Sequence, residues 1–203
     1  MPPYRFTALL LLGYTLAARS PVMPAGVAEL RVHVYNSVSL SDDVLVRAES
    51  ESARLLDRSL RIKWLNCTNF SERNCAWSFE KGDMIVRIVP HTSSSVRTGV
   101  LGEAVTAEAG VYAVVFYDRI SALRGPRTSV SSVLGKVVAH EITHLLMGAD
   151  SHAQVGVMRP TWSNEEFDFY RSGLWFYTPQ QRAAMREQAE RRLAGNCNHQ
   201  DLE

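Results

Sequence analysis

The spacing of apolar residues predicts a series of strands in the N-terminal two thirds of the chain. Residues 30–36 (LRVHVYN) alternate between apolar and polar, and residues 60–65 (LRIKWL) put apolar side chains on one face and basic ones on the other. Residues 84–89 (MIVRIV) predict a third strand. The continuous apolar run at 111–117 (VYAVVFY) is typical of a strand buried on both faces. A weaker pattern at 100–105 indicates a short edge strand.

Two amphipathic helices are expected outside the most apolar part of the chain. Ser41 has the residue type of an N-cap, and apolar residues recur at helical spacing from there to about residue 59. Near the C-terminus, Thr178 and Gln181 (TPQQ) form a capping-box pattern for a helix reaching about residue 193, with Gly195 as its stop.

The most apolar helix is expected at 133–147 (VLGKVVAHEITHLLM), with Ser131 or Ser132 as N-cap and Gly148 as its stop. Such a helix is expected to lie between the sheet and another layer. The sequence indicates a narrow solvent-exposed stripe along it, made of Lys136, Ala139 and Thr143. With the strands, this order of elements predicts an α+β fold in which helices pack on a mixed sheet.

Composition narrows the class of protein. The chain has 203 residues, 46% apolar and 21% charged, which suits one globular domain. Its 22 Lys and Arg nearly balance 21 Asp and Glu, giving a formal net charge of +1. Because the basic excess of a nucleic-acid-binding protein is missing, we expect no nucleic-acid partner.

The N-terminus has the features of a secretory leader. Arg5 precedes an apolar run at 6–18 that is too short to span a bilayer, and small residues that suit cleavage occur up to Ala28. We therefore expect residues 1–28 to be a signal peptide and residues 29–203 to be a secreted or periplasmic domain. No later stretch is long and apolar enough to predict a membrane span in this mature chain.

The cysteines fit an exported protein. Cys67 and Cys75 lie close together in a polar segment (CTNFSERNC), so a local disulfide is expected in an oxidising compartment. Cys197 is left over, either as a free thiol or as a partner of one of the other two.

His140, Glu141 and His144 form an HExxH pattern inside the most apolar helix. Residues four apart lie on one helix face, so both imidazoles can reach one metal ion, and the glutamate can act on a water molecule there. In an apolar helix such side chains are costly without a partner, and a metal ion supplies one. Two histidines leave a catalytic zinc one protein ligand short. His152, Asp150 and Glu165 are the candidates for the third place.

The segment HEITHLLMGADSH, with Met158 soon after it in VGVMRP, resembles the metzincin clan of zinc peptidases. That clan carries HExxHxxGxxH, or Asp in the last place, followed by a methionine-containing turn beneath the metal. The resemblance implies that His140 and His144 are zinc ligands, that Glu141 is the general base and that Met158 belongs to the turn.

This chain departs from the metzincin pattern at the glycine. Met147 stands in the glycine position, and Gly148 follows one residue late, so Asp150 holds the usual third-ligand spacing. A helix that is one residue longer needs a longer return, which favours His152. A neutral imidazole is also the commoner zinc partner beside two histidines. Asp150 remains the alternative.

A second resemblance concerns the thermolysin-like gluzincins, whose third ligand is a glutamate on a later helix, often within NExxxD. The segment NEEFD resembles that context and implies Glu165 as the ligand. This interpretation leaves Gly148, His152 and Met158 without a role. It also has Pro160 shortly before the supposed helix, which counts against it.

The metzincin resemblance implies a twisted mixed sheet with a long helix and an active-site helix, in an upper subdomain of about 29–148. A small, mostly helical lower subdomain is expected at about 149–203. The implied function is that of an exported zinc endopeptidase acting on peptides or proteins, which can align along the edge strand at 100–105. A gluzincin-type peptidase and a secreted zinc-binding module without catalysis are the alternatives.

Overall fold

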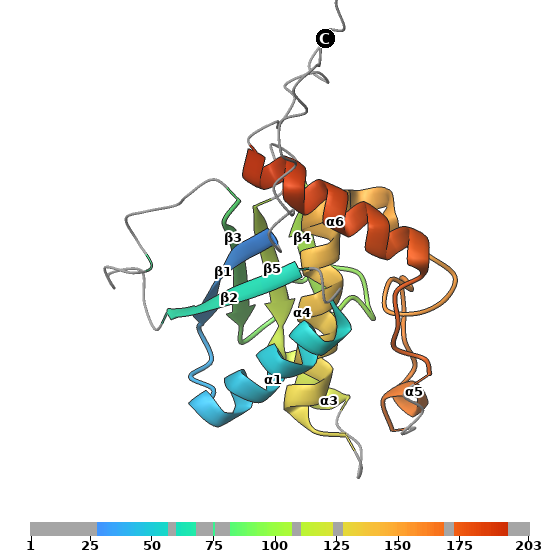
Figure 1. Ribbon diagram of the computed structural model, residues 1–203. Helices are drawn as coiled ribbons and strands as arrows, with labels where there is room; N and C mark the ends of the chain where they lie inside the picture. Colours follow the sequence, from blue (N-terminus) through green and yellow to red (C-terminus); the bar gives the residue numbers. More distant parts are fainter. Residues whose placement is uncertain are drawn as a thin grey trace, which may run out of the picture.

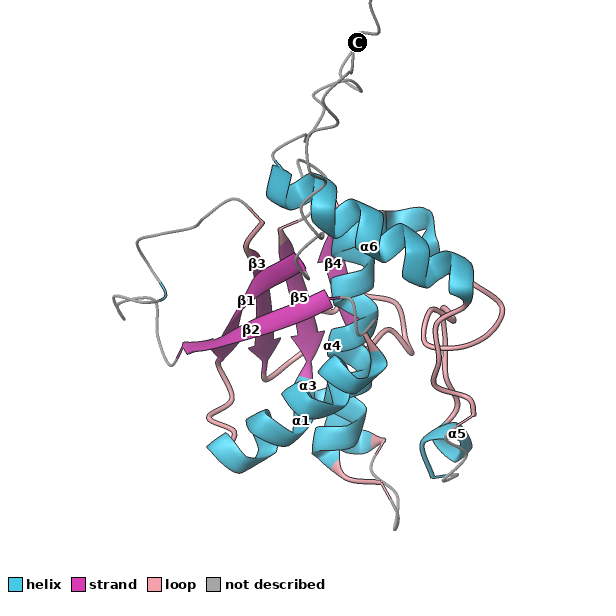
Figure 2. Cartoon of the chain, in the orientation of Figure 1, coloured by secondary structure: helices cyan, strands magenta, loops and turns pink. Residues whose placement is uncertain are grey.

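The computed structural model describes residues 28–56, 60–67, 75, 82–106, 111–123, 128–168 and 173–194. Apart from Ala28, the expected signal peptide lies outside these residues, as do Cys197 and Gly195. Figures 1 and 2 show a single sheet with helices packed against it.

The sheet has five strands in the order β2-β1-β3-β5-β4. The first four are parallel, and β4 pairs antiparallel with β5 at the edge. The sheet is therefore mixed, as expected, and the short edge strand is present. The strands are β1 (Ala28–Asn36), β2 (Leu60–Cys67), β3 (Met84–Val89), β4 (Gly102–Val105) and β5 (Tyr112–Phe116).

The described helices include the three longer ones expected from the sequence. They are α1 (Asp42–Leu55), α3 (Tyr117–Ala122), α4 (Val130–Met147), α5 (Asn164–Asp168) and α6 (Pro179–Ala194), with a 3-10 turn η1 at Ala149–Ser151. Helix α1 ends before residue 59 because Leu56 already has an extended backbone. Helix α3 follows β5 directly and was not expected. None of the described helices combines the length and the apolar character that a membrane crossing requires.

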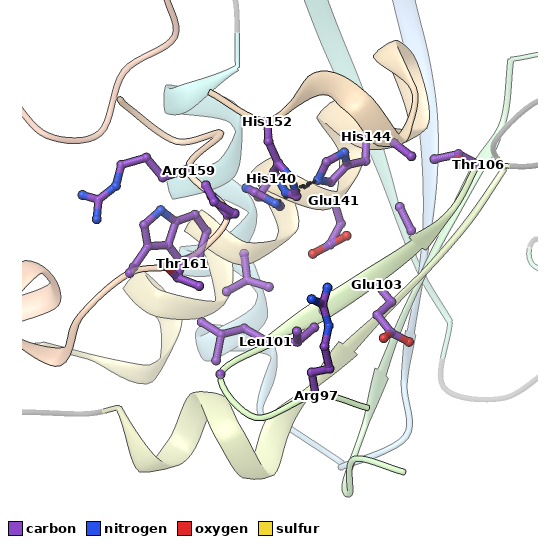
Figure 3. Close-up of a pocket in the computed structure, with 18 of the residues that line it drawn as sticks. Arg97, Leu101, Glu103, Thr106, His140, Glu141, His144, His152, Arg159 and Thr161 are labelled. Carbon is purple, nitrogen blue, oxygen red and sulfur yellow. Dashed lines mark hydrogen bonds between the residues drawn. The ribbon is translucent and has the colours of Figure 1, made fainter. Parts of the chain in front are cut away.

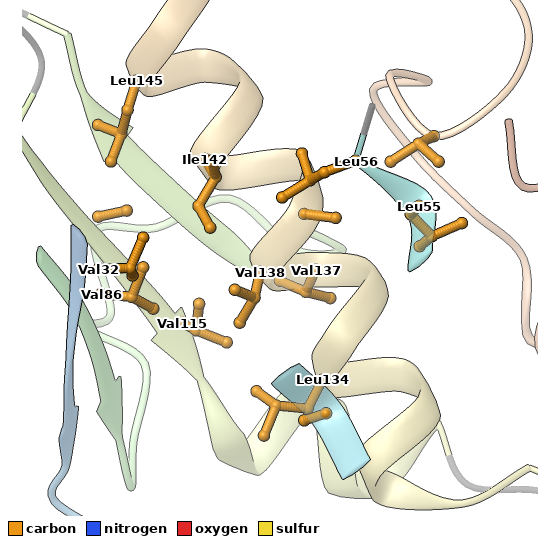
Figure 4. Close-up of a cluster of buried hydrophobic side chains, with 14 of the residues drawn as sticks. Val32, Leu55, Leu56, Val86, Val115, Leu134, Val137, Val138, Ile142 and Leu145 are labelled. Atoms are coloured by element: carbon orange, nitrogen blue, oxygen red, sulfur yellow. The ribbon is translucent and has the colours of Figure 1, made fainter. Parts of the chain in front are cut away.

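Helix α4 lies at the centre of the molecule. It contacts β3, β4 and β5 on the sheet side, while α1 and α6 contact its other sides. Figure 4 shows where its apolar side chains meet those of the sheet. The labelled residues of this core are Leu134, Val137, Val138, Ile142 and Leu145 of α4, Val32, Val86 and Val115 of the sheet, and Leu55 and Leu56 at the end of α1.

The expected solvent-exposed stripe on α4 is wrong. Lys136 is buried with its Nζ 3.2 Å from a carboxylate oxygen of Glu51 on α1. Thr143 is fully buried and its hydroxyl lies 2.8 Å from the hydroxyl of Tyr177. Ala139 is fully buried as well. The sequence pattern predicts these side chains to be exposed because the segments that cover them lie far away along the chain.

The ends of α4 and α6 show how local chemistry sets helix boundaries. The N-cap of α4 is Ser129, whose hydroxyl accepts from the Ser132 N–H, so the helix begins earlier than expected. The capping box of α6 is present: the Thr178 N–H donates to Gln181 Oε1 at 2.9 Å, and the Gln181 N–H donates to Thr178 Oγ1 at 3.2 Å.

A disulfide joins Cys67, at the end of β2, to Cys75. Both cysteines are buried against Tyr35 of β1, whose hydroxyl donates to the Cys75 carbonyl at 2.6 Å. The bridge therefore lies in a small cluster separate from the main core.

Candidate metal centre

Helix α4 presents His140 and His144 on one face, one turn apart. Both side chains are buried, and their Nε2 atoms are 3.0 Å apart. The apolar sequence of α4 holds the helix between the sheet and α6, so these imidazoles have little freedom to move. Figure 3 shows the two rings pointing toward His152.

The chain returns to this point through a left-handed turn. Gly148 ends α4 with φ 88°, a conformation that favours glycine, and its N–H donates to the His144 carbonyl. The turn η1 follows and leads to His152, whose Nε2 lies 3.1 Å from Nε2 of His144. The 3-10 turn thus takes up the extra length of the helix.

The other two candidate ligands lie elsewhere. Asp150 is exposed on η1, and Glu165 is exposed on α5. Among the described residues, ligand atoms of His140, His144 and His152 lie within 4.8 Å of one another, and neither carboxylate belongs to that group. His33, Cys67 and Cys75 form another such group, but its two sulfurs are bonded to each other.

The three nitrogens fit a tetrahedral metal ion. Zinc–nitrogen bonds of about 2.0–2.1 Å at tetrahedral angles place ligand nitrogens about 3.3–3.4 Å apart. The spacings of His144 Nε2 from His140 Nε2 and from His152 Nε2, 3.0 and 3.1 Å, are close to this value. His140 Nδ1 lies 2.8 Å from the Val157 carbonyl, and His144 Nδ1 lies 3.1 Å from the Gly148 carbonyl. Because a carbonyl only accepts, each Nδ1 carries the proton and each Nε2 presents a lone pair.

The protonation of these rings favours metal binding. The pKa of His140 is lowered to about 3, mainly by burial and also by the neighbouring rings of His144 and His152, while the hydrogen bond to the Val157 carbonyl opposes this shift. Burial also lowers the pKa of His144. Neutral imidazoles that direct lone pairs at one point repel one another, and a cation between them removes that repulsion.

Met158 lies in the turn that follows His152. It is fully buried, and its carbonyl accepts from the Ala153 N–H at 2.8 Å, which closes the turn. The preceding residue, Val157, supplies the carbonyl that orients His140. The turn therefore supports one of the three imidazoles directly.

Glu141 points from α4 toward strand β4 (Figure 3). Its side chain is buried, and the pKa of its carboxyl is raised to about 8, mainly by burial and also by the carboxylate of Glu103 on β4. Such a carboxyl can take up and release a proton near neutral pH. A metal ion beside it would lower this pKa by charge attraction.

A cleft of about 530 Å³ opens over the three histidines and Glu141. Its walls are formed by the segment from Arg97 to Thr106, which includes β4, and by the segment from Arg159 to Trp162. The Trp162 ring stands edge-on to that of His140, with the centroids 5.1 Å apart.

Trp162, Arg97 and Glu103 could not be recognised as cleft residues in the sequence, because no pattern distinguishes them from ordinary loop and edge-strand residues. Aromatic residues also precede α6. Trp175 and Tyr177 are buried in the core. Tyr170 lies outside the described residues.

Comparison with known proteins gives a likeness of fold. No protein-family model matches the chain, and no curated protein matches its sequence. Among solved structures it is similar to the archaemetzincin of Methanopyrus kandleri, with a TM-score of 0.53 and 16% identity over 84% of this chain and 100% of that one. It is also similar to metalloproteinase-II of Bacteroides fragilis, with a TM-score of 0.51 and 16% identity over 83% of this chain. The chain covers 55% of the latter protein. It therefore has an α+β fold of the metzincin type.

Proposed function

We propose that this chain is an exported zinc-dependent endopeptidase that hydrolyses peptide bonds in peptides or proteins. One observation carries the proposal: three imidazole Nε2 atoms converge beside a buried carboxyl at the base of an open cleft. A purely structural zinc site needs neither an adjacent base nor an opening to solvent. The metzincin-type fold agrees with this activity.

His140, His144 and His152 would hold the ion, with the Val157 and Gly148 carbonyls keeping two of the rings in position. When bound, zinc supplies a Lewis acid that lowers the pKa of water and polarises a carbonyl.

Glu141 would act as general base. Its carboxylate takes a proton from the attacking water and returns it to the amine that leaves the broken peptide bond. Burial of the carboxyl keeps bulk water from competing for that proton.

The substrate would lie along β4. This strand is at one edge of the sheet and lines the cleft, so its outer backbone groups face the cleft side of the molecule. An extended peptide added there forms backbone hydrogen bonds that depend little on its side chains. The cleft would then accept unfolded segments of many sequences.

Export is part of the proposal. The leader pattern at 1–28 and the Cys67–Cys75 disulfide both suit an oxidising compartment. The catalytic domain would span 29–203, with an upper subdomain to about 148 and a lower one from about 149.

The proposal is tested by measuring zinc per chain together with hydrolysis of a fluorogenic peptide library. We expect about one zinc per wild-type chain. Glu141→Gln should keep the zinc and lose activity at least about 100-fold, as expected for removal of a general base. His152→Ala should lose both zinc and activity, whereas the matched variants Asp150→Ala and Glu165→Ala should keep both.

Each contrary result identifies a different error. Full activity in Glu141→Gln would refute the base assignment. Loss of zinc in Asp150→Ala or Glu165→Ala, with zinc retained in His152→Ala, would give the third ligand place to that carboxylate. A wild-type chain that binds zinc and hydrolyses nothing would be a binding module.

A further inference from the structure

The face of β4 that meets α4 carries very small side chains. Gly102 and Ala104 alternate with Glu103 and Val105, and the latter two are exposed. Ala104 packs against the main core, so its side chain faces inward. By the alternation of a strand, position 102 faces inward as well.

The carboxyl of Glu141 occupies the space that a side chain at position 102 would take. A Cβ built on Gly102 would lie 2.7 Å from Glu141 Oε1 and 3.0 Å from Glu141 Cδ. It would also lie 2.9 Å from the carbonyl oxygen of Val114 on the neighbouring strand. Because backbone lies on one side, the carboxyl is the part that must give way.

Packing is what limits the position of this carboxyl. Within the part of the chain that the structure describes, no N–H or O–H group donates a hydrogen bond to Glu141. Glu141 is nevertheless buried, with only 3% of its surface exposed. The wall that it contacts, the backbone of β4 at Gly102, therefore sets how far it can reach toward that strand.

We propose that Gly102 is a positioning residue for Glu141: its missing side chain provides the volume in which the carboxyl lies beside the three histidines. This inference rests on the proposed function in one respect, namely that Glu141 acts as a base. A methyl group at position 102 would push the carboxyl away by roughly 0.7 Å to restore an ordinary contact of 3.4 Å. Displacements near 1 Å cost proton-transfer and attack steps up to about 100-fold.

The kinetic test compares Gly102→Ala with wild type and with Gly173→Ala. Gly173 has open space around it and no left-handed φ, so an added methyl there meets nothing. We expect Gly102→Ala to keep its zinc and to lose kcat by about 10- to 100-fold, with a smaller change in KM. Gly173→Ala should match wild type. A wild-type kcat in Gly102→Ala would overturn the inference.

A thermal test examines the contact without relying on activity. Gly102→Ala is placed in the wild-type chain and in Glu141→Ala, which lacks the carboxyl, and the four melting temperatures are compared. We expect Gly102→Ala to lower Tm by about 2–4 °C more when Glu141 is present. Equal losses in both backgrounds would overturn the inference. If wild-type protein proves inactive, the proposed function fails, while this comparison still decides whether Gly102 and Glu141 compete for the same volume.

Discussion

Arg119 of α3 holds the segment that forms one wall of the cleft. Its Nη1 donates to the carbonyls of Arg97, at 2.6 Å, and Val100, at 2.5 Å, and its Nη2 donates to that of Val96, at 3.1 Å. Its guanidinium also lies 5.7 Å from the centre of the Phe116 ring. One side chain thus satisfies three carbonyls of the loop that leads into β4.

Arg119→Met keeps the apolar stem and removes all three donors. Each such bond contributes about 1 kcal/mol net, because the freed carbonyls can partly turn to water. We therefore expect the variant to lose roughly 2–3 kcal/mol of unfolding free energy, which lowers Tm by roughly 4–12 °C for a chain of this size. A looser cleft wall must also be ordered when substrate binds. If that ordering costs about 1.4 kcal/mol, KM rises about tenfold.

Thermal unfolding and steady-state hydrolysis of a fluorogenic peptide measure both effects. The matched control is Arg47→Met, because Arg47 is exposed on α1 and pairs only with Asp43 among the described residues. Removal of a surface pair changes stability by less than about 1 kcal/mol. If Arg119→Met has the same Tm as Arg47→Met and keeps the wild-type KM, the three hydrogen bonds do not organise the cleft and this reasoning is refuted.

Two further variants test hydrogen bonds elsewhere in the fold. Tyr177→Phe removes the hydroxyl that donates to the Ala139 carbonyl at 3.0 Å and lies 2.8 Å from the Thr143 hydroxyl, so we expect Tm to fall by roughly 2–8 °C. An unchanged Tm would show that this link does not hold α4. Burial raises the pKa of Asp118, but hydrogen bonds from Thr92 outweigh it, so the net pKa is lowered. The stabilisation is then present above the unfolded pKa, near 3.8, and lost as pH falls through the folded pKa. The Tm of wild type should therefore fall more steeply below about pH 4 than the Tm of Asp118→Asn. Parallel plots of Tm against pH for the two proteins would contradict this.

Elements with a strong local signal agree with the structure. Strand β3 has the bounds that its apolar run predicts, and the capping box of α6 forms the two expected hydrogen bonds. Agreement ends where a local signal is weak or ambiguous. Three neighbouring serines can all cap α4, and the structure uses Ser129. Helix α3 has six residues, fewer than two turns, which is too short for its periodicity to show.

Burial on α4 shows a different limit. Lys136 and Thr143 are polar residues at helical spacing, and composition alone predicts that they face solvent. Glu51 of α1 and Tyr177 before α6 cover them instead. Those partners lie far away in the chain, so no short window of sequence contains the information.

The sequence by itself determined the parts of the candidate site that depend on covalent spacing. His140, Glu141 and His144 sit on one helix, so the helical period alone puts both imidazoles on one face and the carboxyl beside them. Only the tertiary structure decided which later residue joins them, because the positions of His152, Asp150 and Glu165 depend on how the chain turns after Gly148. It also brought Gly102 against Glu141, through the packing of an edge strand on a helix. Local periodicity fixes neighbours within one element, whereas contacts between elements follow from the burial of apolar surface across the whole domain.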